Sequence, residues 1–234
     1  MGWLNGFDVP IELYFSHLLG RHAWFDSLLI QTESTLLLKG GAIVFLVWFL
    51  LFDRKRPGQL REGFELLFGS VFFSLVATLV ARCLALCLPF RVRPLATPWL
   101  QFHFPGDSTP MLTNWSSFPS DHAVMFFALA SGIFMLSRWA GWFAYAWAAV
   151  VICFPRLYLG MHWPTDIVGG MLLGLAFAQF SRIPAVRQLI KRLVLEWRQS
   201  HPETFFPVLF LWSYETIVLF EDVRRVFRLM SHTL

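Results

Sequence analysis

Long apolar runs separated by short polar connections organise this chain, and five of the runs are typical of membrane-spanning helices. A helix needs roughly 20 apolar residues to cross a bilayer. The third and fourth runs are shorter than that, so we expect each to extend through its flanking residues. The five expected spans lie at about 35–52, 64–88, 122–136, 142–154 and 165–180.

Both ends of the chain mix polar and apolar positions. Residues 11–34 suit a helix lying in the outer interface of the membrane. Residues 205–220 are apolar enough to span but include Glu215, and the following EDVRRVFRLM is basic and amphipathic. A sixth span would carry the arginines of that last segment to the outer side, against the usual charge distribution. The pattern favours five spans over six, with an interfacial or re-entrant C-terminal segment.

Composition supports this organisation. Of 234 residues, 56% are hydrophobic and 15% are charged, whereas soluble domains carry roughly 25% charged residues. We therefore expect an all-α polytopic bundle of five or six transmembrane helices, forming a single domain over 1–234 with a core at about 35–182. The net charge of +4 fits basic loops facing anionic lipid better than nucleic-acid binding. Cys83, Cys87 and Cys153 match no metal or disulfide spacing and are expected to be buried thiols.

Lysines and arginines indicate the orientation of the bundle. The alternate connections on one side hold ten of them and those on the other side hold four. The richer side should be cytoplasmic, which places residues 89–121 and 155–164 on the outer face. The opening MGWLNGFDVP lacks the basic start and apolar core of a cleavable signal, so we expect the spans themselves to direct insertion. The expected location is a bacterial inner membrane, with the outer face toward the periplasm or exterior.

Three outer-face stretches hold most of the chemically interesting side chains: PFRVRPL (89–95), FPSDHA (118–123) and PRLYLGMHWPTD (155–166). Ionisable groups at the mouths of spans are costly and usually functional. A helix starting near Pro164 would stack His162 and Asp166 on one face. A carboxylate that accepts from one imidazole nitrogen leaves the other free as a nucleophile. Arg156 can offer a planar fork to a phosphate oxyanion.

The other two stretches supply further anion-binding groups. Ser120 is expected as a helix N-cap, so that the next helix points its first N–H groups and positive dipole end outward. His122 in that first turn could donate a proton to a leaving oxygen. Arg93 and Arg91 add positive charge. Together these groups suit phosphoryl transfer, in which positioning and charge stabilisation dominate, and a phosphohistidine on His162 would split the reaction into two steps.

Two other interpretations of the same residues stay open. A zinc site from His122, His162 and Asp166 is allowed by ligand type, although the neighbouring arginines would repel a cation, so we expect no metal and no cofactor. A lipid-binding or transport protein could use the basic mouth without bond cleavage. Binding alone, however, does not require a histidine and an aspartate four residues apart.

The three stretches resemble the signatures of the type 2 phosphatidic acid phosphatase superfamily, which are Lys-x6-Arg-Pro, Pro-Ser-Gly-His and Ser-Arg-x5-His-x3-Asp. Arg93-Pro94 matches the end of the first, and residues 119–122 match the second with Asp121 in place of glycine. Arg156, His162 and Asp166 match the third at full spacing, with proline in place of serine before the arginine. The resemblance covers roughly residues 82–170.

The resemblance implies a role for each matching residue. His162 is similar to the family's nucleophile, Asp166 to its orienting partner and His122 to the acid that protonates the leaving group. The implied phosphate cradle consists of Arg93, Arg156 and Ser120.

Two departures from the family pattern bear on the phosphate site. The family's lysine falls on Leu86, so that contact is missing or comes from Arg91 or Arg82. Asp121 adds a negative charge that should weaken anion binding unless an arginine pairs with it.

The Pro-Ser-Asp-His form is similar to that of bacterial undecaprenyl-diphosphatases, which act on the carrier lipid of cell-wall synthesis. The expected substrate is therefore a lipid phosphate or pyrophosphate, with undecaprenyl diphosphate favoured, and the expected activity is a metal-independent phosphatase. Transfer of the phosphoryl group to another lipid, and hydrolysis of phosphatidic acid or phosphatidylglycerol phosphate, are the enzymatic alternatives.

Overall fold

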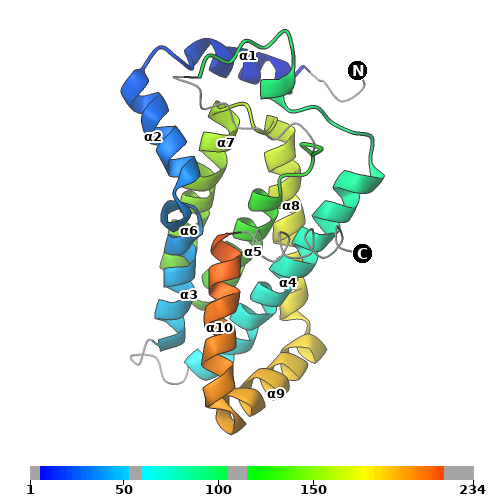
Figure 1. Cartoon of the computed structure of the whole chain (residues 1–234). Helices are drawn as coiled ribbons and strands as arrows, with labels where there is room; N and C mark the ends of the chain where they lie inside the picture. The colour runs from blue at the N-terminus through cyan, green and yellow to red at the C-terminus, as the bar shows by residue number, and fades with distance from the viewer. Residues whose placement is uncertain (1–5, 53–58, 105–114, 219–234) are drawn as a thin grey trace, which may run out of the picture.

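A computed structural model describes residues 6–52, 59–104 and 115–218, and this part of the chain is helical without strands. Figure 1 shows an elongated bundle, with α1 lying across one end and α9 at the other. The α-helices are α1 (Asp8–Leu18), α2 (Ala23–Ser34), α3 (Ala42–Phe52), α4 (Gln59–Cys87), α5 (Asp121–Leu136), α6 (Arg138–Trp147), α7 (Phe154–Tyr158), α8 (Pro164–Gln179), α9 (Pro184–Ser200) and α10 (Pro202–Ile217). The short π and 3-10 segments are η1 (Leu37–Gly41), η2 (Pro94–Ala96), η3 (Ala148–Cys153) and η4 (Phe180–Arg182).

Helix α5 is the centre of the bundle and packs against α4, α6 and α8. Every residue from Ala123 to Ile133 is buried, because this helix meets other helices on all sides. Gly170 and Gly174 of α8 face the α5 backbone, where an added Cβ would collide with the carbonyl oxygens of Ser120 and Val124. Small residues at four-residue spacing thus let two helices approach closely. This contact fixes the start of α5 against the start of α8.

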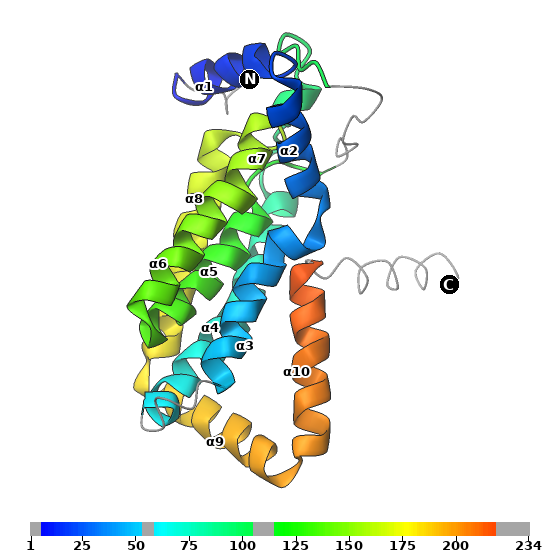
Figure 2. The same ribbon diagram turned by 90° about the vertical axis from the view of Figure 1, so that its left-hand side faces the viewer.

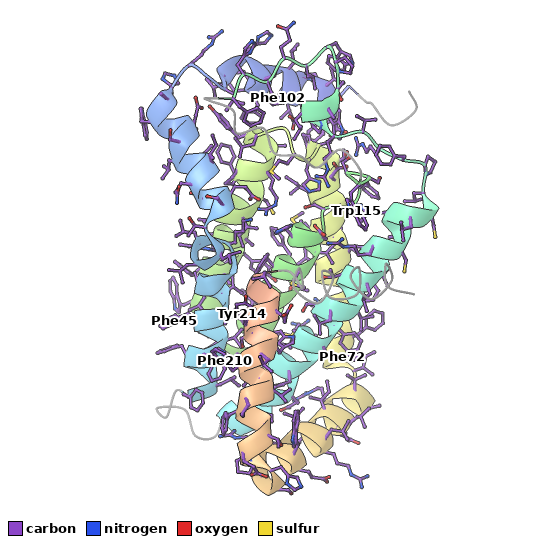
Figure 3. The ribbon with its side chains drawn as sticks, viewed as in Figure 1. Phe45, Phe72, Phe102, Trp115, Phe210 and Tyr214 are labelled. Atoms are coloured by element: carbon purple, nitrogen blue, oxygen red, sulfur yellow. The ribbon has the colours of Figure 1, made fainter. Side chains whose placement is uncertain are left out.

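Each expected span coincides with helical structure, but the helices differ in length from the spans expected. Among the described residues, two stretches of helix, Glu65–Cys87 and Arg138–Tyr158, are long and apolar enough to cross a membrane alone, and up to four spans result if each of two bent pairs counts as one. The fourth expected run does extend, through α6, η3 and α7. The third does not, because α5 ends at Leu136 and α6 begins at Arg138. In Figure 3, Phe45, Phe72 and Phe210 project from α3, α4 and α10, and all three are exposed, as lipid-facing side chains would be.

The N-terminal segment departs from the single interfacial helix that its pattern suggested. It forms two helices, of which α1 packs on α7 and α8 and α2 packs on α7. The buried face of α1 consists of Asp8, Glu12 and Ser16, whereas Leu13 and Tyr14 are exposed. This helix therefore turns its polar side toward the bundle. Polar groups at the end of the bundle, described below, are the reason.

The C-terminal helices leave the bundle at its other end. Helix α9 buries no residue and exposes Leu189 and Leu193, which is typical of an interfacial helix. Helix α10 then runs back beside α3 (Figure 2), where Trp48 Nε1 donates to Ser213 Oγ at 2.7 Å. The expected basic segment at 221–230 lies outside the described residues.

The expectation of three buried thiols is wrong for two of the cysteines. Cys83 and Cys87 are exposed on α4, and only Cys153 is buried. The two exposed thiols are four residues apart on an uncovered face of α4.

Candidate active site

The three polar stretches meet at the end of the bundle beneath α1, and backbone hydrogen bonds join them. Leu95 N donates to Gly160 O at 2.8 Å, Ser117 N to Arg91 O at 2.9 Å, and Ser120 N to Asp166 O at 3.1 Å. The turn before α8 needs Gly160, whose φ of 64° lies in the left-handed region and whose Cα faces the Phe102 ring. Figure 3 places Phe102 and Trp115 at this same end. The convergence that the motifs require is thus present.

His162 is buried with its two ring nitrogens in different environments. Nδ1 lies 2.9 Å from the Ser117 carbonyl oxygen and 3.6 Å from Asp166 Oδ2. Nε2 lies 3.3 Å from Arg93 Nη1. Because a carbonyl only accepts, Nδ1 carries the proton and donates to it, which leaves the Nε2 lone pair directed toward Arg93. The nearest acceptor for Nδ1 is therefore a backbone carbonyl, and Asp166 acts at slightly longer range.

The surroundings of His162 keep it neutral. Burial lowers the pKa of the imidazole below its ordinary value, and the positive charge of Arg93 acts in the same direction. The hydrogen bond and negative charge of Asp166 oppose this shift. A neutral imidazole with a free Nε2 is the form that can attack phosphorus.

Asp166 is held from two sides at the start of α8. Its Oδ2 accepts from Trp163 N at 2.8 Å, and its Oδ1 accepts from Arg91 Nη1. Pro164 occupies the first turn of this helix, as expected. The carboxylate is fully buried and keeps one position relative to His162.

Arg93 and Ser120 both have polar atoms without partners in the described part of the chain. Arg93 Nη1 donates to Met161 O at 2.5 Å, but its buried Nε has no hydrogen-bond partner there. Ser120 is the N-cap residue of α5, as expected, yet its side chain makes no capping bond and its buried Oγ is unpaired. Buried donors are rarely left unsatisfied. These two groups, on the stretches that hold His162, suit a ligand that supplies anionic oxygens.

Arg156 contacts the carboxylate of Glu33, which the sequence motifs do not predict. Its Nη1 lies 2.8 Å from Glu33 Oε2 and its Nη2 donates to Glu33 Oε1 at 3.1 Å. Nη1 also donates to Ile152 O at 2.7 Å, and Lys39 Nζ lies 3.0 Å from Glu33 Oε1. The guanidinium fork expected for phosphate is thus occupied by a carboxylate from α2.

Asp121 pairs with Arg82, so its charge is balanced in the way that anion binding requires. Asp121 Oδ2 accepts from Arg82 Nη2, and Oδ1 lies 3.2 Å from His122 Nδ1. Arg82 also lies over the Trp115 ring, 5.3 Å from its centroid. Leu86, at the position of the family's lysine, is an apolar side chain that is 74% exposed.

Arg91 occupies a different position from the one that a phosphate-binding residue would take. Its Nη2 donates to Asp8 Oδ2 at 2.6 Å and its Nη1 to Asp166 Oδ1 and, at 2.9 Å, to Thr165 Oγ1. Arg91 is buried between two carboxylates. Asp8 is a site residue that the motifs do not predict, although Asp8, Glu12 and Ser16 recur every four residues and form one polar face of α1, a pattern that could have identified it.

A metal centre would need several ligands at one point. Within residues 6–52, 59–104 and 115–218, no three histidine, cysteine or acidic side chains converge closely enough to hold a metal ion. The zinc interpretation of His122, His162 and Asp166 requires such a convergence.

Comparison with known proteins identifies the class of protein to which this site belongs. The chain belongs to the PAP2 superfamily, whose family model matches residues 70–188. The resemblance drawn from the three motifs is confirmed.

Particular relatives match over short segments. The chain is 45% identical over 60 residues to a putative undecaprenyl-diphosphatase, YbjG, of Escherichia coli, which is 25% of this chain and 30% of that protein. It is 36% identical over 65 residues to an undecaprenyl-diphosphatase of Sulfolobus acidocaldarius (28% and 31%). It is 42% identical over 59 residues to a lipid A 4'-phosphatase of Bacteroides thetaiotaomicron (24% and 26%). The matches thus span about a third or less of each relative.

A solved structure extends the likeness to the fold. The crystal structure of Aquifex aeolicus LpxE aligns with a TM-score of 0.50 at 19% identity, over 76% of this chain and 96% of that one. The fold likeness therefore extends well beyond the short segments that match the relatives in sequence.

Proposed function

We propose that this protein is a membrane lipid phosphatase that acts through a phosphohistidine on His162, with undecaprenyl diphosphate as its substrate. The observation that carries the proposal is the pair of environments around His162. Its Nδ1 is fixed by the Ser117 carbonyl, while its Nε2 faces Arg93. The unpaired Ser120 Oγ and Arg93 Nε lie among the same joined stretches.

In the first proposed step, Nε2 forms a bond to the terminal phosphorus and the bond to the lipid-side oxygen breaks. His122 donates a proton to that leaving oxygen, so the lipid monophosphate departs. In the second step, water attacks the phosphohistidine, His122 accepts the proton and inorganic phosphate is released. Asp166 stabilises the positive charge that the imidazole carries in between. Arg93, Ser120 and Arg156 hold the phosphoryl oxygens. For this, Arg156 releases the Glu33 carboxylate and binds a phosphoryl oxygen in its place.

The site end of the bundle is proposed to face outward, at the periplasmic side of a bacterial inner membrane, with five spans crossing it. Lysine and arginine distribution supports this orientation. The lipid tail would stay in the bilayer while the phosphate head enters beneath α1.

A lipid panel tests the proposal. Purified wild type should release phosphate from undecaprenyl diphosphate, and His162→Ala should release none while remaining folded. His201→Ala, at the exposed cytoplasmic end in this orientation, is the matched control and should keep wild-type activity. Wild-type turnover in a chelator should be unchanged, since no step uses a metal. Full phosphate release by His162→Ala would refute the proposal.

The second candidate is a lipid A phosphatase, favoured by the relative from Bacteroides thetaiotaomicron. Including lipid A, phosphatidic acid and phosphatidylglycerol phosphate in the panel separates these substrates by kcat/KM. Turnover that requires an added acceptor lipid, and that yields the phosphorylated acceptor in place of inorganic phosphate, would instead indicate phosphoryl transfer.

A further inference from the structure

Helix α1 covers the end of the bundle where the candidate site lies (Figure 1) and turns charged side chains toward it. Asp8 is the first residue of this helix and is completely buried. Burying a carboxylate is costly unless donors and a positive charge surround it. Its contacts therefore show what holds α1 in place.

Asp8 binds the first turn of α8 and the guanidinium of Arg91. Its Oδ1 accepts from Thr165 N at 2.9 Å, and its Oδ2 accepts from Thr165 Oγ1 at 2.7 Å. Oδ2 also accepts from Arg91 Nη2 at 2.6 Å. Thr165 immediately precedes Asp166, so Asp8 ties α1 to the residue beside the orienting carboxylate.

Arg91 connects the two carboxylates electrostatically. One guanidinium is shared by Asp8 and Asp166, so the three side chains together carry a net negative charge of one. Without the Asp8 charge, Arg91 would neutralise Asp166 alone. The imidazole of His162, 3.6 Å from Asp166, would then lose much of the negative potential that stabilises its cationic form.

We propose that Asp8 is a positioning residue for the reaction at His162, which fixes the start of α8 and shares Arg91, so that Asp166 keeps its place and Arg91 does not neutralise its negative charge alone. This inference rests on the proposed function. It makes α1 part of the active-site assembly although the helix lies far from the family motifs in the sequence.

Asp8→Asn is the main test, because the amide has nearly the same shape and lacks the charge. We expect kcat to fall about tenfold, less than the roughly 10²–10⁴-fold that a general acid or base contributes. KM should stay within about twofold, because Asp8 touches none of the proposed cradle. The acid limb of the kcat/KM profile should move to lower pH, because the pKa of His162 falls when negative charge is removed.

A second measurement does not depend on turnover. The His162 ring nitrogens can be titrated by NMR in 15N-histidine-labelled protein, with the signal assigned by its loss in His162→Gln. Asp8→Asn should lower the midpoint. Asp26→Asn is the matched control, because Asp26 is an equally buried aspartate whose partners are Tyr158 Oη and Gly20 N. Its midpoint and kcat should match wild type.

Thr165→Val covers the case in which Asp8→Asn does not fold. It removes one donor to Asp8 with little change in shape, and kcat should fall severalfold. An unchanged kcat and an unchanged His162 midpoint in the Asp8 variant, or in Thr165→Val if only that variant folds, would overturn the inference. If the wild type hydrolyses no lipid, the proposed function is refuted. If Asp8→Asn still has a lower His162 midpoint than that wild type, the electrostatic link of Asp8 to His162 remains intact.

Discussion

We predict that ionisation of Glu12 makes the docking of α1 on the bundle depend on pH. Its side chain is completely buried, and neither carboxyl oxygen has a hydrogen-bond partner among the described residues. Burial, together with the negative charges of Asp166 and Asp8, raises the pKa of Glu12 to about 9. Glu12 is therefore protonated at neutral pH when α1 is docked.

The docking of α1 weakens as the pH rises, because docking and protonation of Glu12 are coupled. In undocked α1 the carboxyl is in water and ionises near its ordinary value of 4.5. Because docking raises the pKa of Glu12, the protonated carboxyl stabilises docked α1. This stabilisation is fully present below pH 4.5 and is lost as the pH rises to about 9. Each pH unit within that window weakens docking by about 1.4 kcal/mol, or tenfold in the equilibrium. Over the whole window the loss is about 6 kcal/mol.

Hydrogen exchange of residues 7–18 measures this docking. Glu12→Gln, which cannot ionise, is compared with wild type at each pH so that the intrinsic pH dependence of exchange cancels. Protection in wild type should fall relative to the variant by up to tenfold per unit between about pH 6 and pH 9. A constant ratio of protection across that range would refute the reasoning.

Three further predictions follow from the packing and charges. Gly174→Ala should lower stability by about 1–3 kcal/mol, because the new Cβ meets a carbonyl of α5 that cannot move aside; thermal unfolding checks this, with Gly6→Ala, in open space, as the unaffected control. Arg82→Gln should raise KM by roughly fivefold with little change in kcat, because a half-buried pair contributes about 1 kcal/mol to balancing Asp121; an unchanged KM would contradict this. The acid limb of kcat/KM should lie below the ordinary histidine value of 6.5, because the lowered pKa of His162 keeps its nucleophilic form neutral at lower pH; a limb above 6.5 would count against it.

Much of the fold was accessible from the sequence because its causes are local. Apolar runs long enough to be helical predicted the helices of the bundle. Helix ends were less predictable. The π-helical segment η3 precedes Pro155, a residue without an N–H, and the helix continues through it to carry Arg156 to the site. Nothing in the apolar pattern distinguishes that continuation from a break.

The candidate site was predictable where spacing carried the information and unpredictable where partners come from distant helices. His162 and Asp166 follow from four-residue spacing on one turn. The carboxylates of Asp8 and Glu33 reach Arg91 and Arg156 from residues more than 80 positions away in the sequence. No local pattern specifies such a pair. The inward polar face of α1 likewise depends on the charges it meets, which its own hydrophobic pattern does not specify.

The most direct test of the central claim is detection of the phosphorylated enzyme. Wild type, mixed with undecaprenyl diphosphate and quenched rapidly in base, which preserves phosphohistidine, should yield a peptide carrying one phosphoryl group on His162. The same peptide from His162→Gln should be unmodified. Hydrolysis at the wild-type rate with phosphate on another residue, or in the variant that lacks His162, would contradict the account.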